Sequence, residues 1–506
     1  MKLFLLRCVR GLIIFLGKKL LLDEIASSAL YNSNERSDSP KCDEETRVGI
    51  LEEINSWRTD QTTVTGVLCI TGSAGAGKSA LMQTAAEQSA SKGQLAATFF
   101  FSANDPRRND LKQFAPTIAY QIALSNKKDS ALGNSIFRAV DRDPSVFQLS
   151  FESQVAELIV KPLQQTFSNE QDANVGNLSL PPSFPPDIFI DGLDECIDKE
   201  SQDQLLRLLW AVFISKSLPF KILLASRPES PLRTALLSPS GYMRKTGYII
   251  HLNDHDAAAD IRNCLTRRLG AIGMSSEDPR AQKNWPSTKD VDLLVSASSG
   301  LFVYASTVVK FVNQRRRWPV PQLQIVIDNL KGLAASTAGN SKVPKHPFSQ
   351  LDNLYRNIFV LAQTEYESQC DDSTPLSIVR VVRMLTNPPP TLKFVMTRPT
   401  KPRGDVHLWT DFFRAGELIV SSTTFEELCQ LQQGQMRLML SDLHSLYDIT
   451  FDPIRAKPYH RSVQEFLRDP TRCGDLYMPD EDVWIQWSTC MLNTISRASE
   501  NDSDFD

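Results

Sequence analysis

Residues 67–79, VLCITGSAGAGKS, decide the fold of the first half of this 506-residue chain. The apolar run Val67–Thr71 stops at Gly72, which is the pattern of a buried parallel strand. The next eight residues match the phosphate-binding pattern G-x-x-x-x-G-K-[ST]. A helix is expected over 79–91, so the pattern has the strand before it and the helix after it that it requires. This context favours a phosphate-binding loop over a flexible Gly/Ala turn.

Each residue type in this loop has a chemical reason to be there. Glycines let backbone N–H groups surround phosphate oxygens without a clash from a Cβ atom. The helix that follows adds the positive end of its dipole. Lys78 supplies a charge to the outer phosphates, and the Ser79 hydroxyl can ligate Mg²⁺. The predicted nucleotide-binding residues of the loop are Gly72, Ser73, Ala74, Gly75, Ala76, Gly77, Lys78 and Ser79.

A second apolar strand, Ile188–Ile190, leads into the acidic sequence Asp191-Gly-Leu-Asp194-Glu195. Ligands of α/β sheets bind outside the carboxyl ends of the strands, so we expect Asp191 to hold Mg²⁺. Asp194 or Glu195 would then orient or deprotonate an attacking water. The alternative is a group of acids that caps the N-terminus of a helix.

Three arginines follow other predicted strands. Arg227 comes after the strand Lys221–Ala225, where it could contact a γ-phosphate or stabilise charge in the transition state. An ion pair with nearby acids is the alternative for Arg227. Arg107 and Arg108 follow the strand at 96–102 and are candidates for the same face, although ion pairing is the favoured interpretation for both.

The order of elements predicts an α/β domain with a parallel sheet and helices on both faces. Its remaining elements are expected as helices at 111–124 and 202–215 and a strand at 248–252, with a surface excursion at 170–186. Beyond residue 254 the pattern is helical, at 256–269, 288–298 and 302–313. A linker is expected over 331–348, and no element is predicted for 386–410. The predicted organisation is an N-terminal helix and linker (1–38), a nucleotide-binding domain (39–253), a helical domain (254–340), a winged-helix-like domain (341–495) and a disordered tail (496–506).

Composition excludes several classes of protein. The net charge of −4 gives no electrostatic reason to expect nucleic-acid binding. Nine scattered cysteines without a CxxC pair indicate reduced thiols, hence a cytoplasmic protein. Residues 1–22 are apolar and basic, but their longest uncharged apolar run, Gly11–Gly17, is too short to span a bilayer. We expect a helix packed on the first domain, with a membrane-surface helix or a signal peptide as alternatives.

Taken together, these residues resemble the NACHT group of the STAND class of P-loop NTPases. They are most similar to the fungal proteins whose NTPase resembles the nephrocystin-3 N-terminal domain. The resemblance implies a nucleotide-binding domain followed by a helical and a winged-helix domain. The matching segments are 39–47, 72–79, 101–109, 188–196, 223–229, 299–305, 347–352 and 459–469.

The same resemblance implies a molecular switch. ADP would keep the protein closed, and exchange for ATP would open it and permit assembly with other chains. In related switches a winged-helix histidine touches the β-phosphate of ADP, and His460 stands in the matching motif here; a structural histidine is the alternative. The expected function is an ATP/ADP switch with slow Mg²⁺-dependent hydrolysis, in fungal defence or non-self recognition. The alternative is a nucleotide-binding scaffold or adaptor without hydrolysis, and a small-molecule kinase is disfavoured.

Overall fold

The computed structural model divides the chain into two compact units, Met1–Asp256 and Ala257–Asp506. Each unit is described by itself. The described residues are 16–36, 39–60, 66–125, 130–167, 184–214, 218–282, 284–314, 317–337, 348–369, 377–388, 413–414, 417–418 and 421–503. The expected excursion at 170–186 and the irregular stretch at 386–410 fall largely outside them.

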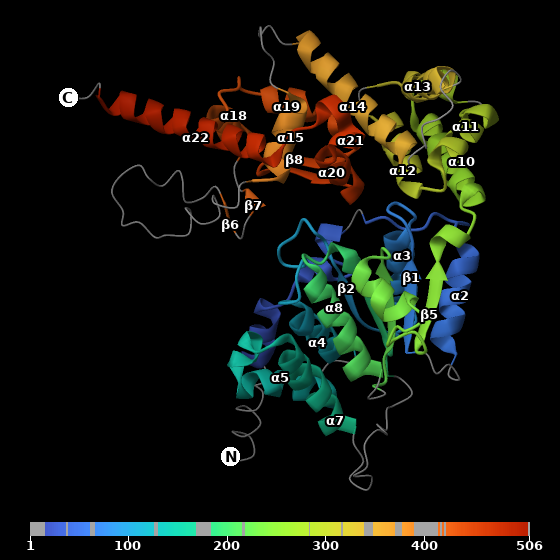
Figure 1. The fold of residues 1–506 in the computed structure, drawn as a ribbon, viewed down its shortest axis with the longest axis vertical. Coiled ribbons are helices and arrows are strands. Elements are labelled where there is room, and N and C mark those ends of the chain that lie inside the picture. Colours follow the sequence, from blue (N-terminus) through green and yellow to red (C-terminus); the bar gives the residue numbers. More distant parts are fainter. Residues whose placement is uncertain are drawn as a thin grey trace. The chain divides into compact units, whose positions relative to one another are not determined.

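The first unit is built on a five-stranded sheet whose neighbouring strands all run parallel, which confirms the predicted fold class (Figure 1). Strand β4 lies between β1 and β3, so the ends of these three strands are adjacent. Thr71 is in register with Ser226, and Asp191 is in register with Ala225. The strands, in their order across the sheet, are β2 (Leu95–Phe100), β3 (Asp187–Asp191), β4 (Lys221–Ser226), β1 (Val67–Thr71) and β5 (Gly247–His251).

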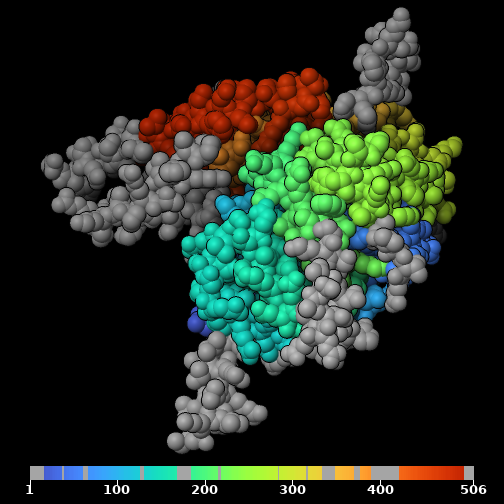
Figure 2. All heavy atoms as spheres, turned by 60° about the horizontal axis from the view of Figure 1, so that its bottom comes forward, coloured from blue at the N-terminus to red at the C-terminus, as the bar shows by residue number. Residues whose placement is uncertain are grey.

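Helices cover both faces of this sheet because alternate strand residues point to opposite sides. Leu68 and Ile70 pack with α2 and α3 in one core, whereas Val67 and Cys69 belong to the core of the opposite face (Figure 1). In the space-filling view, α5–α7 form a continuous layer on the outside of this unit (Figure 2). The helices concerned are α2 (Val48–Thr59), α3 (Lys78–Ser91), α4 (Phe114–Ser125), α5 (Ala131–Arg142), α6 (Phe151–Val155), α7 (Lys161–Phe167) and α8 (Lys199–Leu208).

The segment before α2 also packs on this unit. Residues 16–23 are helical, and Leu21 and Ala26 are fully buried. The backbone N–H of Ala26 donates to Thr117 Oγ1 at 2.9 Å, and that of Tyr31 donates to Thr98 Oγ1 at 3.0 Å. The expected packing of the N-terminal helix is therefore seen from residue 16 onward, whereas residues 1–15 lie outside the described part. Within that part, no helix combines the length and the apolar character needed to cross a membrane.

The second unit is helical around one continuous apolar core. An antiparallel hairpin of strands β8 and β9 lies between α19 and α20. The elements are α10 (Ala258–Ser275), α11 (Thr288–Ser298), α12 (Phe302–Val312), α13 (Pro319–Thr337), α14 (Ser349–Gln369), α15 (Ile378–Thr386), β6 (Phe413–Arg414), β7 (Glu417–Leu418), α18 (Ser422–Leu428), α19 (Gln435–Leu440), β8 (Tyr447–Phe451), β9 (Ile454–Pro458), α20 (Arg461–Arg468), α21 (Pro470–Cys473) and α22 (Asp480–Ser503).

Two helices extend beyond the limits expected from the sequence. Helix α13 continues to Thr337, where a linker was expected from 331, because its last residues include Leu and Ala and no proline. Helix α22 continues to Ser503, where a disordered tail was expected from 496. Neither glycine nor proline occurs between 480 and 503, so nothing in the sequence ends the helix earlier.

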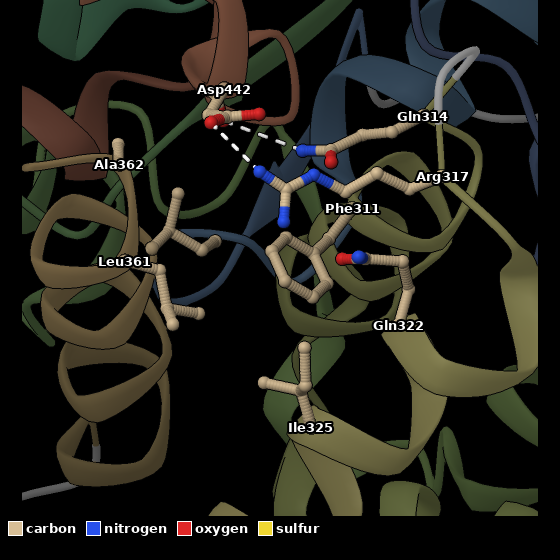
Figure 3. A pocket seen from close by; sticks show the side chains of 9 residues that line it. Phe311, Gln314, Arg317, Gln322, Ile325, Leu361, Ala362 and Asp442 are labelled. Atoms are coloured by element: carbon tan, nitrogen blue, oxygen red, sulfur yellow. Dashed lines mark hydrogen bonds and ion pairs between the residues drawn. The ribbon is translucent and has the colours of Figure 1, made fainter. Parts of the chain in front are cut away.

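A short basic run at 315–317 follows α12, and only Arg317 of it is described. Its Nη2 lies 3.0 Å from Asp442 Oδ2 and 3.5 Å from Glu365 Oε2. Gln314 Nε2 donates to the backbone carbonyl of Asp442 at 3.4 Å (Figure 3). A cavity of about 10 Å³, with room for about one water, is bordered by Arg317, Gln314, Asp442 and Phe311. Arg317 therefore holds the end of α12 against α14 and the turn at 441–443.

Candidate functional site

The loop between β1 and α3 has the backbone that a phosphate cradle needs. Gly75 has a φ of 76° and Gly77 a φ of 97°, in the left-handed region that residues with a Cβ rarely adopt. Gly77 directly precedes the first residue of α3, Lys78. The N–H groups at the start of a helix have no partner within it, so an anion at this position would accept from them.

Lys78 lies over this loop. Its Nζ donates to the carbonyl oxygens of Gly72 and Ser73, both at 2.9 Å. Burial lowers the pKa of Lys78 and Arg227 acts in the same direction, while the charge of Asp194 opposes the shift. The ammonium group is thus held inside the site and surrounded by carboxylates, where a phosphate oxygen could replace the loop carbonyls as its acceptor.

Ser79 and Asp191, the two predicted metal ligands, meet in the structure. Asp191 is the last residue of β3 and is only 5% exposed. The Ser79 hydroxyl acts on its carboxylate and favours the ionised form. Burial raises the pKa of Asp191 to about 6, although the Ser79 bond and the charges of Arg36 and Lys78 oppose the rise. A metal cation bound beside this carboxylate would further favour its ionised form.

These two residues suit magnesium in particular. Among the residues that the structure describes, no group of three or more His, Cys, Asp or Glu side chains is arranged to hold a metal ion. Mg²⁺ is usually held by one or two carboxylates together with waters and substrate phosphates. Ser79 and Asp191, beside a phosphate cradle, are a donor set of that kind.

Arg227 is paired with an acid. Its backbone N–H donates to Asp194 Oδ1 at 3.0 Å, and its Nε lies 3.1 Å from Asp194 Oδ2. The Asp194 side chain is 6% exposed. The structure therefore shows the ion pair that the sequence left as the alternative for Arg227, and it shows Asp194 fixing this arginine at the end of β4.

Glu195 is also held by a protein group. Its Oε2 accepts from the backbone N–H of Ala103 at 3.1 Å, which joins the end of β3 to the loop after β2. The turn that places Glu195 begins at Gly192, with a φ of 74°, and the N–H of Glu195 donates to the carbonyl of Gly192 at 2.7 Å. Both acids that were expected to position water are thus engaged within the protein.

Arg107 and Arg108 take the structural role that the sequence favoured. Arg108 Nε donates to Asp105 Oδ2 at 2.9 Å, and Arg108 Nη1 donates to the carbonyl of Phe100 at 3.2 Å. Arg107 Nη2 lies 2.9 Å from Glu35 Oε1. The two arginines fasten the loop after β2 and connect it with the segment before α2.

Sequence reasoning missed two residues of this site, Asn253 and Arg36. Asn253 follows β5, and its Oδ1 accepts from the N–H of Ser73 at 3.2 Å and from the Ser73 hydroxyl at 3.3 Å. Burial lowers the pKa of Arg36 to about 10, opposed by the charge of Asp191. Its position directly after the strand predicted at 248–252 was a weak signal for Asn253. Nothing in the polar sequence around Arg36 pointed to it.

His460 lies in the second compact unit, where it caps helix α20. Its Nδ1 accepts from the backbone N–H of Ser462 at 3.1 Å, and the Ser462 hydroxyl lies 2.6 Å from the same nitrogen. An N–H group can only donate, so Nδ1 is unprotonated and the proton of the neutral ring is on Nε2. Capping is the structural role that the sequence left open for this histidine.

Comparison with known families gives one result for this site. Residues 49–227 match the family described as nephrocystin 3, N-terminal. The matched range begins in α2 and ends at Arg227, so it includes the phosphate loop and the acidic end of β3. No curated protein matches the chain significantly.

Proposed function

From a chain whose residues 49–227 match the nephrocystin 3 N-terminal family, we propose a signalling switch that binds ATP and ADP with Mg²⁺ and hydrolyses ATP slowly. The observation that carries this proposal is that Ser79, at the start of α3, acts on the buried carboxylate of Asp191, at the end of β3, beside a loop with two left-handed glycines. A role in fungal defence or non-self recognition comes with the resemblance and is part of the proposal.

In this switch the chain's residues bind and orient the nucleotide. The N–H groups of the loop donate to the phosphate oxygens, and Lys78 redirects its N–H donors from the loop carbonyls to the outer phosphates. Ser79 and Asp191 hold the cation, which when bound neutralises charge on the phosphate oxygens. Arg227, fixed by Asp194, supplies positive charge at the end of the neighbouring strand.

A second candidate is a nucleotide-binding scaffold without hydrolysis. The observation that favours it is the engagement of both acids: Asp194 pairs with Arg227, and Glu195 accepts from Ala103. A carboxylate that accepts from protein donors is a weaker base for water than one directed at the substrate. The nucleotide would then act as a structural cofactor.

The first experiment is to purify the protein without added nucleotide, denature it, and identify released nucleotide by chromatography. Binding of ADP and of an ATP analogue is then measured by calorimetry for the wild type and for Lys78→Ala. Lys92→Ala is the matched control, because Lys92 lies at the other end of α3 and bonds Asn55. We expect Lys78→Ala to abolish binding and Lys92→Ala to leave it intact. Normal binding by Lys78→Ala would refute the assignment.

Phosphate release separates the two candidates. If the protein is a switch, the wild type releases phosphate from ATP slowly in the presence of Mg²⁺, and the Asp191→Asn variant does not. A scaffold binds nucleotide but releases no phosphate from ATP in the presence of Mg²⁺. Light scattering of the protein with ADP and with the ATP analogue tests the proposed nucleotide-dependent assembly, which should give larger particles with the analogue.

A further inference from the structure

Arg36 is held against the sheet by two contacts. It ends the short turn η2 (Asn34–Arg36), and its Cζ lies 3.8 Å from the ring centroid of Phe100. Its Nη2 donates to Gln83 Oε1 at 3.0 Å. Both contacts fix the orientation of the guanidinium plane, which stacks on the aromatic ring.

The two partners of Arg36 lie beside the predicted metal ligands. Phe100 is the last residue of β2 and is in register with Asp191 on β3. Gln83 is four residues after Ser79 on α3, so the two side chains share a face of that helix. The guanidinium is therefore held between α3, which carries Ser79, and the end of β2, which pairs with the end of β3 at Asp191. The charges of Asp191 and Glu195 act on it.

Arg36 also retains a hydrogen-bond donor that no described residue accepts. Its Nε is buried and has no hydrogen-bond partner among the described residues. Arg108 differs, because its Nε donates to Asp105. A buried N–H without an acceptor destabilises the protein unless a ligand supplies one.

We propose that Arg36 contacts the terminal phosphate group of a bound nucleoside triphosphate and so makes the site distinguish the triphosphate from the diphosphate. The guanidinium fork matches phosphate oxygens, and a charge-assisted bond of this kind is strong in a buried site. The inference rests on the proposed nucleotide binding and assigns a further contact within it. It also makes the segment at residues 16–36, which carries Arg36, sensitive to the bound nucleotide.

The test compares two dissociation constants measured by calorimetry in Mg²⁺, one for ADP and one for a non-hydrolysable ATP analogue. The proteins are the wild type, Arg36→Ala, Arg36→Lys and the control Arg107→Ala, whose arginine pairs with Glu35 on the same segment. We expect Arg36→Ala to weaken binding of the analogue about tenfold or more, because a charged hydrogen bond is lost, and to weaken binding of ADP much less. Arg36→Lys, which keeps the charge without the fork, should lie between, and Arg107→Ala should match the wild type.

The remaining outcomes separate this inference from the proposed function. If Arg36→Ala and Arg36→Lys change the dissociation constants of ADP and of the analogue by the same factor, the site binds nucleotide but Arg36 does not contact the terminal phosphate. That result overturns the inference. If the wild type binds neither nucleotide, the proposed function fails and the inference fails with it. Thermal unfolding of each variant shows whether it folds. If Arg36→Ala does not fold, the comparison rests on Arg36→Lys, which keeps the positive charge and the aliphatic stem.

Discussion

Replacing Asp191 by asparagine should stabilise the protein in the absence of nucleotide and metal. Asp191 is 5% exposed, and burial raises the pKa of its carboxyl group from 3.8 to about 6. The ionised form is therefore disfavoured in the folded state, although it is the form that would bind a cation. Asparagine has the same shape, carries no charge, and can still accept the hydrogen bond from Ser79.

The size of the effect follows from the pKa. A carboxyl group whose pKa is raised on folding adds stability below its unfolded pKa of 3.8 and loses that contribution as the pH rises through 6. At ~1.36 kcal/mol per pKa unit, the ionised group costs up to about 3 kcal/mol at pH 7.5. The asparagine variant avoids this cost, and its advantage should fall to about half at pH 5, where the wild-type carboxyl is mostly protonated.

Thermal unfolding in EDTA at pH 7.5 and pH 5 measures this difference. For a unit of this size the advantage at pH 7.5 corresponds to a rise in Tm of up to about 10 °C. Asp105→Asn is the matched control, for which we expect the opposite change in Tm. Burial alone would raise the pKa of Asp105, but bonds from Ser28, from the N–H of Arg107 and from Arg108 lower it.

Asp105→Asn should therefore lower the Tm, because the ionised form of Asp105 is the one that the folded protein favours. An unchanged or lower Tm for Asp191→Asn at pH 7.5 would refute the reasoning. It would mean that burial does not destabilise the ionised carboxylate of Asp191 in the protein without nucleotide and metal.

Two further predictions concern stability. Arg58 Nη2 lies 2.6 Å from Asp187 Oδ2 with both side chains 1% exposed, so Arg58→Met should destabilise the first unit by about 3–5 kcal/mol in urea unfolding. The double variant Arg58→Met, Asp187→Leu should recover most of this loss, and a double variant as unstable as the single one would contradict the buried-pair argument. His460→Ala removes the cap of α20 and should cost about 1 kcal/mol in thermal unfolding, whereas His460→Asn should not; equal Tm values for the two variants would count against capping.

The sequence predicted best what depends on neighbouring residues. The strand at 67–71, the loop after it and the acidic end of β3 are local patterns, and the structure places all of them in one sheet. Local patterns failed over 131–167, where no helix was predicted. Between α6 and α7 the π-helical segment Ala156–Val160 shifts the regular spacing of apolar residues. The pattern of α5 is regular, and the prediction overlooked it.

The partners of the site residues could not be predicted in the same way. Arg227 meets Asp194 because β4 lies between β1 and β3, and strand order is set by packing across the whole sheet. Arg36 reaches the site because its segment packs on β2, through Tyr31 and Thr98. Such contacts join residues far apart in the chain, and no short sequence pattern predicts them.

The hydrogen bond between Asn253 and Ser73 connects the phosphate loop to the end of the first unit through a short stretch of chain. Asn253 lies three residues before Asp256, where the first unit ends. A stretch of this length spans at most about 10 Å, so it has little slack. A displacement of the chain at Asp256 therefore has only three residues in which to be absorbed before it reaches Asn253, whose side chain accepts from the N–H and the hydroxyl of Ser73.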